Sequence, residues 1–231
     1  AMTPFKFLIF LICLFAMACK KEAGQNGIAD KGILYDTAQF GTKIKGYKSD
    51  AADFNAAQQL IDDVVAEFGT VDILVNNAGI LNYAPILDMP VEECEQMFAT
   101  NVIACYDISR EVAQHMVARG GGQMIFVTSG SARNVGMHAV VYAATKHAVS
   151  AFAKGFRLEL KSANVRVTEL APGMVDTDMR KGITHPEVLK ALAARPFKPI
   201  SAQDVADGVV YAVSCKPSNS PDLIELRPPR A

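Results

Sequence analysis

The sequence predicts an α/β fold, a single Rossmann-like domain built on a doubly wound parallel sheet. Short apolar runs of strand length alternate along the chain with longer segments whose apolar residues recur at helical spacing. The short runs are continuously apolar, as at residues 71–76, which is typical of parallel strands covered by helices on both faces. Such an alternation predicts right-handed crossovers between neighbouring strands. The 231 residues, 50% of them apolar, can bury the core of one such domain.

Each element is predicted from its own local pattern. Residues 54–69 carry apolar side chains at helical spacing and stop at a glycine, which predicts a helix. Residues 91–120 show a longer helical pattern with a kink expected near Asn101. Ser201 precedes the last helical pattern with Asp204 three positions later, a variant of the capping box. The predicted elements in chain order are helix 54–69, strand 71–76, helix 91–120, strand 123–129, helix 140–163, strand 165–171 (ended by Pro172 and Gly173), helix 201–214 and strand 222–228.

The first fifty residues fit this alternation less well. Residues 31–37 and 41–50 are candidate strands, but the few residues between them cannot hold the helix that joins parallel neighbours. Either a helix is missing or the first piece is not a strand of the sheet. The N-terminal part of the α/β unit is therefore predicted to be incomplete.

Residues 2–22 differ from the rest of the chain. One lysine precedes an apolar run at residues 7–18, and small residues stand just before Cys19. This pattern indicates a signal-like leader, more specifically a bacterial lipoprotein leader with Cys19 as the lipidated residue. The alternative is a buried strand or helix that replaces a missing first strand. We divide the chain into a leader-like segment, 1–22, and a Rossmann-like domain, 23–231.

Composition excludes several classes of function. The net charge is −1, so nothing points to a nucleic-acid partner. The five cysteines form no CxxC pair, and no group of histidines and cysteines has the spacing of metal ligands, so no metal site is predicted.

The most informative chemistry lies in Tyr142, Lys146 and Ser129. Residues four apart on a helix share one face, so the Tyr142 phenol and the Lys146 ammonium point into the same space. A tyrosine pKa of about 10 is too high for work at neutral pH, and a nearby cation lowers it. Ser129, thirteen residues before Tyr142 at a strand end, can hydrogen-bond a carbonyl or an alcohol. The three side chains can move a proton on and off a carbonyl oxygen; the alternative is an ordinary surface pair on a helix.

Five motifs in one order resemble the short-chain dehydrogenase/reductase family. They are VDILVNNAG at 71–79, TNV around Asn101, Ser129, the pair Tyr142 and Lys146, and APGMVDT at 171–177. The resemblance covers about residues 44–231. It implies hydride transfer between NAD or NADP and a small-molecule alcohol, ketone or hydroxy acid, in the cytoplasm where the cofactor pool is. It also implies a homodimer or homotetramer formed through helices 91–120 and 140–163.

The resemblance assigns catalytic roles to four residues. Tyr142 would be the general acid/base, Lys146 would lower its pKa and bond the nicotinamide ribose, and Ser129 would orient the substrate oxygen. Asn101 would keep its helix open and hold a water in a proton relay; the alternative for Asn101 is a tolerated surface residue. Substrate selection would fall to a lid at residues 176–199 and to Leu81, Tyr83, Arg133, Val135, Met137 and His138.

The resemblance also implies a set of cofactor contacts. Asp50 would contact the adenine, the segment at 76–79 would border the adenosine half, and the loop after the strand at 165–171 would face the nicotinamide. Asp36 is a weak candidate for a selector of NAD, and the preference stays open. The implied cofactor-binding residues are Asp50, Asn76, Ala78, Gly79, Tyr142, Lys146, Pro172, Gly173, Val175 and Thr177.

The sequence departs from the family in one place. Members open with a glycine-rich TGxxxGxG turn that holds the cofactor pyrophosphate at a helix N-terminus. The nearest string here, AGQNGIA at 23–29, is one residue short between its glycines. The alternative function is therefore a catalytically impaired remnant, either anchored as a lipoprotein through Cys19 after export by residues 2–19 or serving as a dimerising module.

Overall fold

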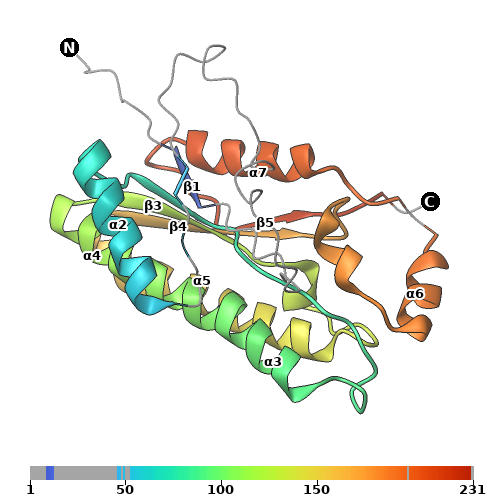
Figure 1. Cartoon of the computed structure of the whole chain (residues 1–231). Helices are drawn as coiled ribbons and strands as arrows, with labels where there is room; N and C mark the ends of the chain where they lie inside the picture. The colour runs from blue at the N-terminus through green and yellow to red at the C-terminus, as the bar shows by residue number, and fades with distance from the viewer. Residues whose placement is uncertain (1–8, 13–45, 48, 50–52, 197, 230–231) are drawn as a thin grey trace.

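A parallel five-stranded sheet forms the centre of the computed structural model (Figure 1). The structure describes residues 9–12, 46–47, 49, 53–196 and 198–229. The strands lie in the order β1-β2-β3-β4-β5, and each pairs in parallel with the next. Their bounds are β1 Ile9–Ile12, β2 Ile73–Asn76, β3 Gly122–Val127, β4 Val165–Pro172 and β5 Leu223–Leu226.

Helices cover both faces of the sheet, which makes three layers. Alternate strand residues divide between two cores: Leu74 and Phe126 pack toward α2, α4 and α5, whereas Val75 and Ile125 pack toward α7. This period of two is what a strand buried on both faces requires. The helices are α2 Phe54–Phe68, α3 Val91–Phe98, α4 Ala104–Arg119, α5 Val140–Leu160, α6 Pro186–Ala193 and α7 Ala202–Ser214.

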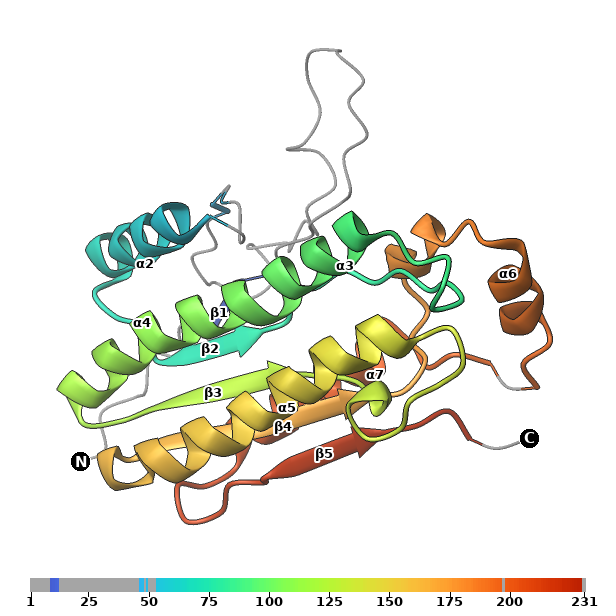
Figure 2. The ribbon, with the colours of Figure 1, turned by 90° about the horizontal axis from the view of Figure 1, so that it is seen from below.

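The expectation of right-handed crossovers holds for α5 and is wrong for α7. The chain steps from β3 to β4 through α5 and from β4 to β5 through α7, in the same direction across the sheet. The two helices lie on opposite faces, so the two connections have opposite hands, and Figure 2 shows the one through α5 to be right-handed. The connection into α7 first runs out through α6, so no short strand–helix turn imposes the usual hand.

Local capping fixes the helix ends that the sequence predicted. The Asp53 side chain accepts from the backbone N–H groups of Asn55 and Ala56 at the start of α2. Gly69 ends α2 in the left-handed conformation, with φ 83°, which suits a residue without Cβ. Ser201 and Asp204 form a reciprocal capping box at the start of α7.

The predicted kink in the helix at 91–120 is a π-helical turn. Residues Ala99–Ile103 form this turn between α3 and α4, and Asn101 lies at its centre. π-helical turns are rare and occur preferentially at functional sites.

The structure describes only a few of the first fifty residues, so it bears on only part of what the sequence predicts there. Ile9–Ile12 form β1, which pairs with β2 from Ile9 opposite Ile73 to Ile12 opposite Asn76, so the alternative of a strand in this apolar run holds there. Residues 46, 47 and 49 belong to no strand. Cys19, the glycine string at 23–29, the candidate strand at 31–37, Asp36 and Asp50 lie outside the described residues.

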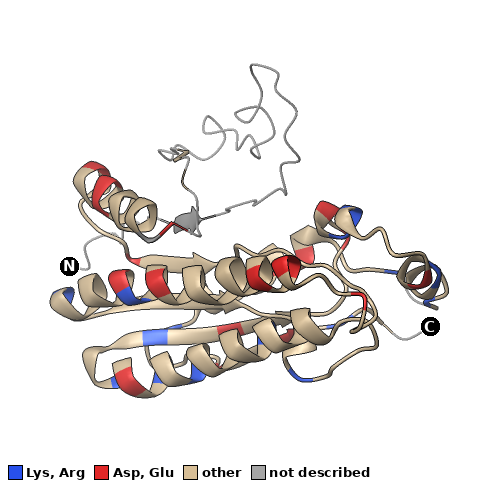
Figure 3. Ribbon diagram, turned by 60° about the horizontal axis from the view of Figure 1, so that its bottom comes forward, with Lys and Arg blue, Asp and Glu red and all other residues tan. Residues whose placement is uncertain are grey.

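Charged side chains of both signs lie along α4 and α5 (Figure 3). In the part of the chain that the structure describes, no helix is long and apolar enough to cross a membrane.

Candidate active site

The carboxyl ends of three neighbouring strands meet at one edge of the sheet. Residues 77–79 follow β2, Ser129 follows β3, and Gly173 follows β4. Open α/β folds bind their ligands at this edge, because the loops that leave it diverge. Helix α5 brings Tyr142 and Lys146 to the same place; both are buried.

Asn101 ties the π-helical turn to the end of β2. Its Oδ1 accepts from the backbone N–H of Ile80 at 2.8 Å, and its Nδ2 donates to the Ile80 carbonyl at 2.8 Å. The same Nδ2 donates to Thr145 Oγ1 on α5 at 3.1 Å. Asn101 is 1% exposed, so its interpretation as a tolerated surface residue is wrong.

Lys146 lies between the ends of β2 and β3. Its Nζ donates to the carbonyl of Val127 at 3.2 Å and stands 5.8 Å from the centroid of the Tyr142 ring. A Cβ added to Gly79 would come within 3.2 Å of Asn101 Oδ1 and 3.5 Å of Lys146 Nζ. Glycine at position 79 therefore allows these two side chains to approach the strand end together.

Burial lowers the pKa of Lys146 to about 8, because the charged ammonium is taken out of water. The nearby Cys105 thiol opposes this shift. Burial in turn raises the pKa of Cys105 to about 12, so this thiol stays protonated at neutral pH.

Tyr142 is held in an apolar cluster with Met97 and Val141. Burial raises the pKa of its phenol above the ordinary value, and Tyr83 raises it further. The hydrogen bond with Ser129 is the influence that lowers it. Lys146 is not among the influences on this pKa, so the expected lowering by Lys146 is wrong for this structure: burial raises the pKa, and the Lys146 Nζ donates to the carbonyl of Val127.

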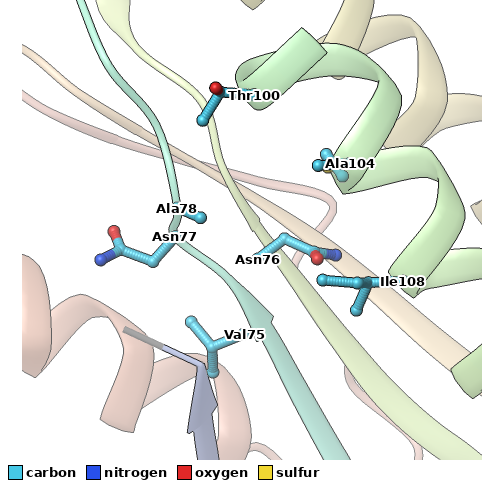
Figure 4. Close-up of a pocket in the computed structure, with 8 residues that line it drawn as sticks. Val75, Asn76, Asn77, Ala78, Thr100, Ala104 and Ile108 are labelled. Carbon is cyan, nitrogen blue, oxygen red and sulfur yellow. The ribbon is translucent and has the colours of Figure 1, made fainter. Parts of the chain in front are cut away.

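The residues after β2 border a small pocket, drawn in Figure 4. Asn76 points toward α4, where its Nδ2 donates to Ser109 Oγ at 2.8 Å, while Asn77 points to the other side of the chain. This bond joins β2 to α4. The pocket is lined by Val75, Asn76, Asn77, Ala78, Thr100, Ala104, Cys105 and Ile108.

The loop after β4 is held by backbone bonds. Pro172 ends the strand, and the Gly173 N–H donates to the carbonyl of Leu226 at 2.7 Å. Val175 bridges to Ile200 at the far end of the lid segment, and its carbonyl accepts from Arg180 at 3.1 Å. Thr177 is exposed and begins the short helix Asp178–Gly182.

The predicted substrate residues lie in different surroundings. Leu81 and Tyr83 pack beside Tyr142, and the rings of Tyr83 and Tyr142 meet edge to face at 5.8 Å. Val135 and Met137 are exposed. Arg133, expected in the substrate pocket, is instead committed to ion pairs with two glutamates, Glu169 at 2.9 Å and Glu225 at 3.0 Å.

Glu169 is a feature that the sequence interpretation missed. It lies on β4 and is 1% exposed, among the most buried side chains described. The available signal was a carboxylate in VRVTELA, a segment predicted to be a buried strand. A charge is seldom fully buried without a partner, so Glu169 should have one.

The chain belongs to the short-chain dehydrogenase family, whose family model matches residues 23–188. It is 30% identical over 197 residues to the 7alpha-hydroxysteroid dehydrogenase of Escherichia coli (strain K12), a match that covers 84% of this chain and 76% of that protein.

Two solved structures resemble it. One is a 7 alpha-hydroxysteroid dehydrogenase complexed with NADH and 7-oxo glycochenodeoxycholic acid, with TM-score 0.70 and 30% identity over 82% of this chain and 75% of that one. The other is the closed form of a serine dehydrogenase complexed with NADP+, with TM-score 0.72 and 27% identity over 79% of this chain and 75% of that one. Relatives therefore bind NADH or NADP+, and the family is one of oxidoreductases.

Proposed function

We propose that this chain is an NAD(P)-dependent oxidoreductase that transfers hydride reversibly between the cofactor and a small alcohol, ketone or hydroxy acid. The observation that carries the proposal is the approach of Asn101 and Lys146 to Gly79, beside Tyr142 and its bond to Ser129. These four side chains come from three different elements, so no local helix pairing explains their meeting.

The nicotinamide half of the site fits a dinucleotide. The Lys146 ammonium has three N–H groups, and within the described residues it bonds one carbonyl, which leaves donors for ribose hydroxyls. Gly173 packs so closely that a Cβ would stand 2.9 Å from Pro228 Cδ and 3.3 Å from the carbonyl of Leu226, which holds the loop after β4 near the sheet edge. When bound, the nicotinamide supplies or accepts the hydride.

The chain's own residues handle the proton. Ser129 orients the substrate oxygen, and Tyr142 donates a proton to it as a carbonyl is reduced. A phenol whose pKa is raised stays protonated at neutral pH, which suits the donor role. In the oxidation direction Tyr142 must be a phenolate to accept the proton, and a Lys146 cation 5.8 Å from its ring centroid would favour that form. Asn101 holds Ile80 and α5 in register around them.

The surroundings of Tyr142 favour a substrate with an apolar body. Leu81, Tyr83 and Met97 belong to the same cluster as Tyr142. Tyr83 also presents a hydroxyl, which hydrogen-bonds Ser131. A small or medium hydroxy or oxo compound fits such mixed walls.

Titration of the purified chain with NADH and with NADPH, followed by nucleotide fluorescence, tests the proposal. Saturable binding that weakens in Lys146→Met and persists in Lys154→Met supports it, since Lys154 is an exposed lysine two turns further along α5. No binding of either nucleotide at millimolar concentration rejects it.

A second candidate is a non-catalytic remnant of the family. The absence of a TGxxxGxG string from the sequence favours it, because backbone donors at that turn supply much of the affinity for the pyrophosphate. A folded chain that binds neither nucleotide would support this candidate.

We also propose that the chain forms a homodimer or homotetramer through α4 and α5. Ile103, Tyr106 and Leu158 are large apolar residues that stay exposed on or beside these helices. The cofactor requirement places the enzyme in the cytoplasm under this proposal. Membrane attachment enters only if Cys19 is lipidated; incorporation of labelled fatty acid that Cys19→Ala abolishes would demonstrate it.

A further inference from the structure

Glu169 lies on β4 in the alternate set with Val165 and Val167, which faces α5. Its carboxylate is buried between the strand end that carries Ser129 and the helix that carries Tyr142 and Lys146. Among the described residues, none of the four proposed catalytic side chains hydrogen-bonds or ion-pairs with it.

Three donors from three different segments converge on this carboxylate. Thr128 Oγ1 donates to Oε1 at 2.8 Å, Ser150 Oγ donates to Oε2 at 3.1 Å, and Arg133 Nη2 pairs with Oε2 at 2.9 Å. Thr128 is the residue immediately before Ser129. Ser150 stands one turn beyond Lys146 on α5, and Arg133 ends the short helix Gly130–Ala132 that follows Ser129.

The same network holds the turn after Ser129 from its other side. Arg133 Nε pairs with Glu225 at 3.0 Å, and Arg227 pairs with the same Glu225 oxygen at 3.1 Å. The Arg227 guanidinium packs directly on Gly130, where an added Cβ would lie 2.5 Å from Nη1. The segment from Thr128 to Arg133 is thus held at its start, at Gly130 and at its end.

A buried carboxylate is not needed for packing, because an apolar residue of similar volume serves a core as well or better. What a fully bonded carboxylate adds is a fixed geometry among the groups that donate to it. We propose that Glu169 is a positioning residue that sets the distance between Ser129 and Tyr142 by bonding both Thr128 and α5. This inference rests on the proposed function for its catalytic consequence, but its structural part can be tested without cofactor.

The chain offers a matched pair of variants. Thr128→Val removes the hydroxyl that donates to Glu169 at 2.8 Å, and with it the longer 3.3 Å contact of that hydroxyl with the Leu170 carbonyl, at nearly constant volume. Thr168→Val makes the same change on β4 at a buried hydroxyl that has no hydrogen-bond partner among the described residues. Thr128→Ser keeps the donor and serves as the conservative rescue.

The first readout is hydrogen exchange of the Ser131 amide, which donates to Ser129 Oγ at 3.1 Å and so reports the position of Ser129. In protein without cofactor, Thr128→Val and Glu169→Gln should raise this exchange rate by about tenfold, equivalent to the loss of one buried hydrogen bond. Thr168→Val and Thr128→Ser should leave it near the wild-type rate. Equal exchange at Ser131 in all variants overturns the positioning role whether or not the chain is an enzyme.

The second readout is turnover. Thr128→Val should lower kcat by about tenfold or more with an unchanged KM for the cofactor, and Thr128→Ser should restore kcat. A Thr168→Val variant that loses as much kcat as Thr128→Val would mean that general loosening of the core is responsible, which also overturns the proposal. If the wild type has no turnover, the proposed function fails, while the exchange experiment still decides the role of Glu169. If Glu169→Gln does not fold, Thr128→Val alone decides it.

Discussion

The side-chain amide of Asn101 bonds both backbone groups of Ile80, accepting from its N–H and donating to its carbonyl at 2.8 Å each. Through Thr145 the same amide reaches the helix that carries Tyr142. In a regular helix the Asn101 side chain would point in another direction. The π-helical turn therefore brings Asn101 to Ile80 and to the site.

Replacing Asn101 by alanine should destabilise the fold and the site together. The change leaves the half-buried N–H and carbonyl of Ile80 without their partner, which costs about 2–4 kcal/mol in the free energy of unfolding. Urea unfolding measures it, with Gln114→Ala on the exposed side of α4 as the control. A loss below about 0.5 kcal/mol would show that water replaces the amide without cost.

Tyr142→Phe should abolish turnover and leave the fold intact. The variant keeps the ring in its apolar cluster and removes only the hydroxyl that bonds Ser129. General acid catalysis contributes about 10²–10⁴-fold, so kcat should fall by at least the lower figure while nucleotide binding is unchanged. Tyr83→Phe, at the neighbouring ring, is the control and should lose much less. Unchanged turnover in Tyr142→Phe would remove Tyr142 from the mechanism.

Much of the fold follows from local sequence signals. Helices α2 and α7 begin and end within one residue of their predicted bounds. Their capping residues, Asp53, Gly69 and Ser201, bond to backbone groups only a few positions away, so the local sequence is enough to predict these helix ends. β3 and β5 were predicted at the right places, although both are shorter than their apolar runs. Ser129 leaves the strand to cap the next turn with its own side chain, which a run of apolar letters does not reveal.

The parts that the sequence did not predict depend on distant partners. The kink near Asn101 was predicted but its π-helical form was not, because the partners of Asn101, Ile80 and Thr145, are 21 and 44 residues away. The pairing of Arg133 with Glu169 joins two segments across the sheet edge, and neither residue alone indicates its partner. The left-handed connection through α7 follows from which face α7 covers, a property of the assembled core. The four proposed catalytic residues themselves were found from their types and order.

The exposed apolar residues on and beside α4 and α5 predict self-association. Ile103 is 56% exposed and Leu158 is 79% exposed, and a charge at each should prevent two copies from packing these helices together. We expect Ile103→Glu combined with Leu158→Glu to shift a dimer or tetramer to monomer in size-exclusion chromatography with light scattering. Leu87→Glu, at a residue 94% exposed before α3, is the control. A wild type that is monomeric at micromolar concentration would contradict the assignment.

The buried ammonium of Lys146 should make stability depend on pH in a defined direction. Its pKa falls from 10.5 to about 8, so the unfolded chain binds this proton more tightly than the folded chain does. The charge therefore opposes folding below about pH 8, and the folded state gains stability as pH rises from about 8 to 10.5.

Lys146→Met should raise the free energy of unfolding at pH 6 by about 1–3 kcal/mol. The variant relieves the cost of burying the ammonium, and the loss of the bond to Val127 offsets part of that gain. The gain over wild type should shrink toward pH 10. Urea unfolding of both proteins across this range measures the difference, and Lys154→Met, on an exposed face of α5, should show no such trend. A Lys146→Met variant that is less stable than wild type at every pH would mean that the ammonium stabilises the fold and that its bond to Val127 outweighs its burial.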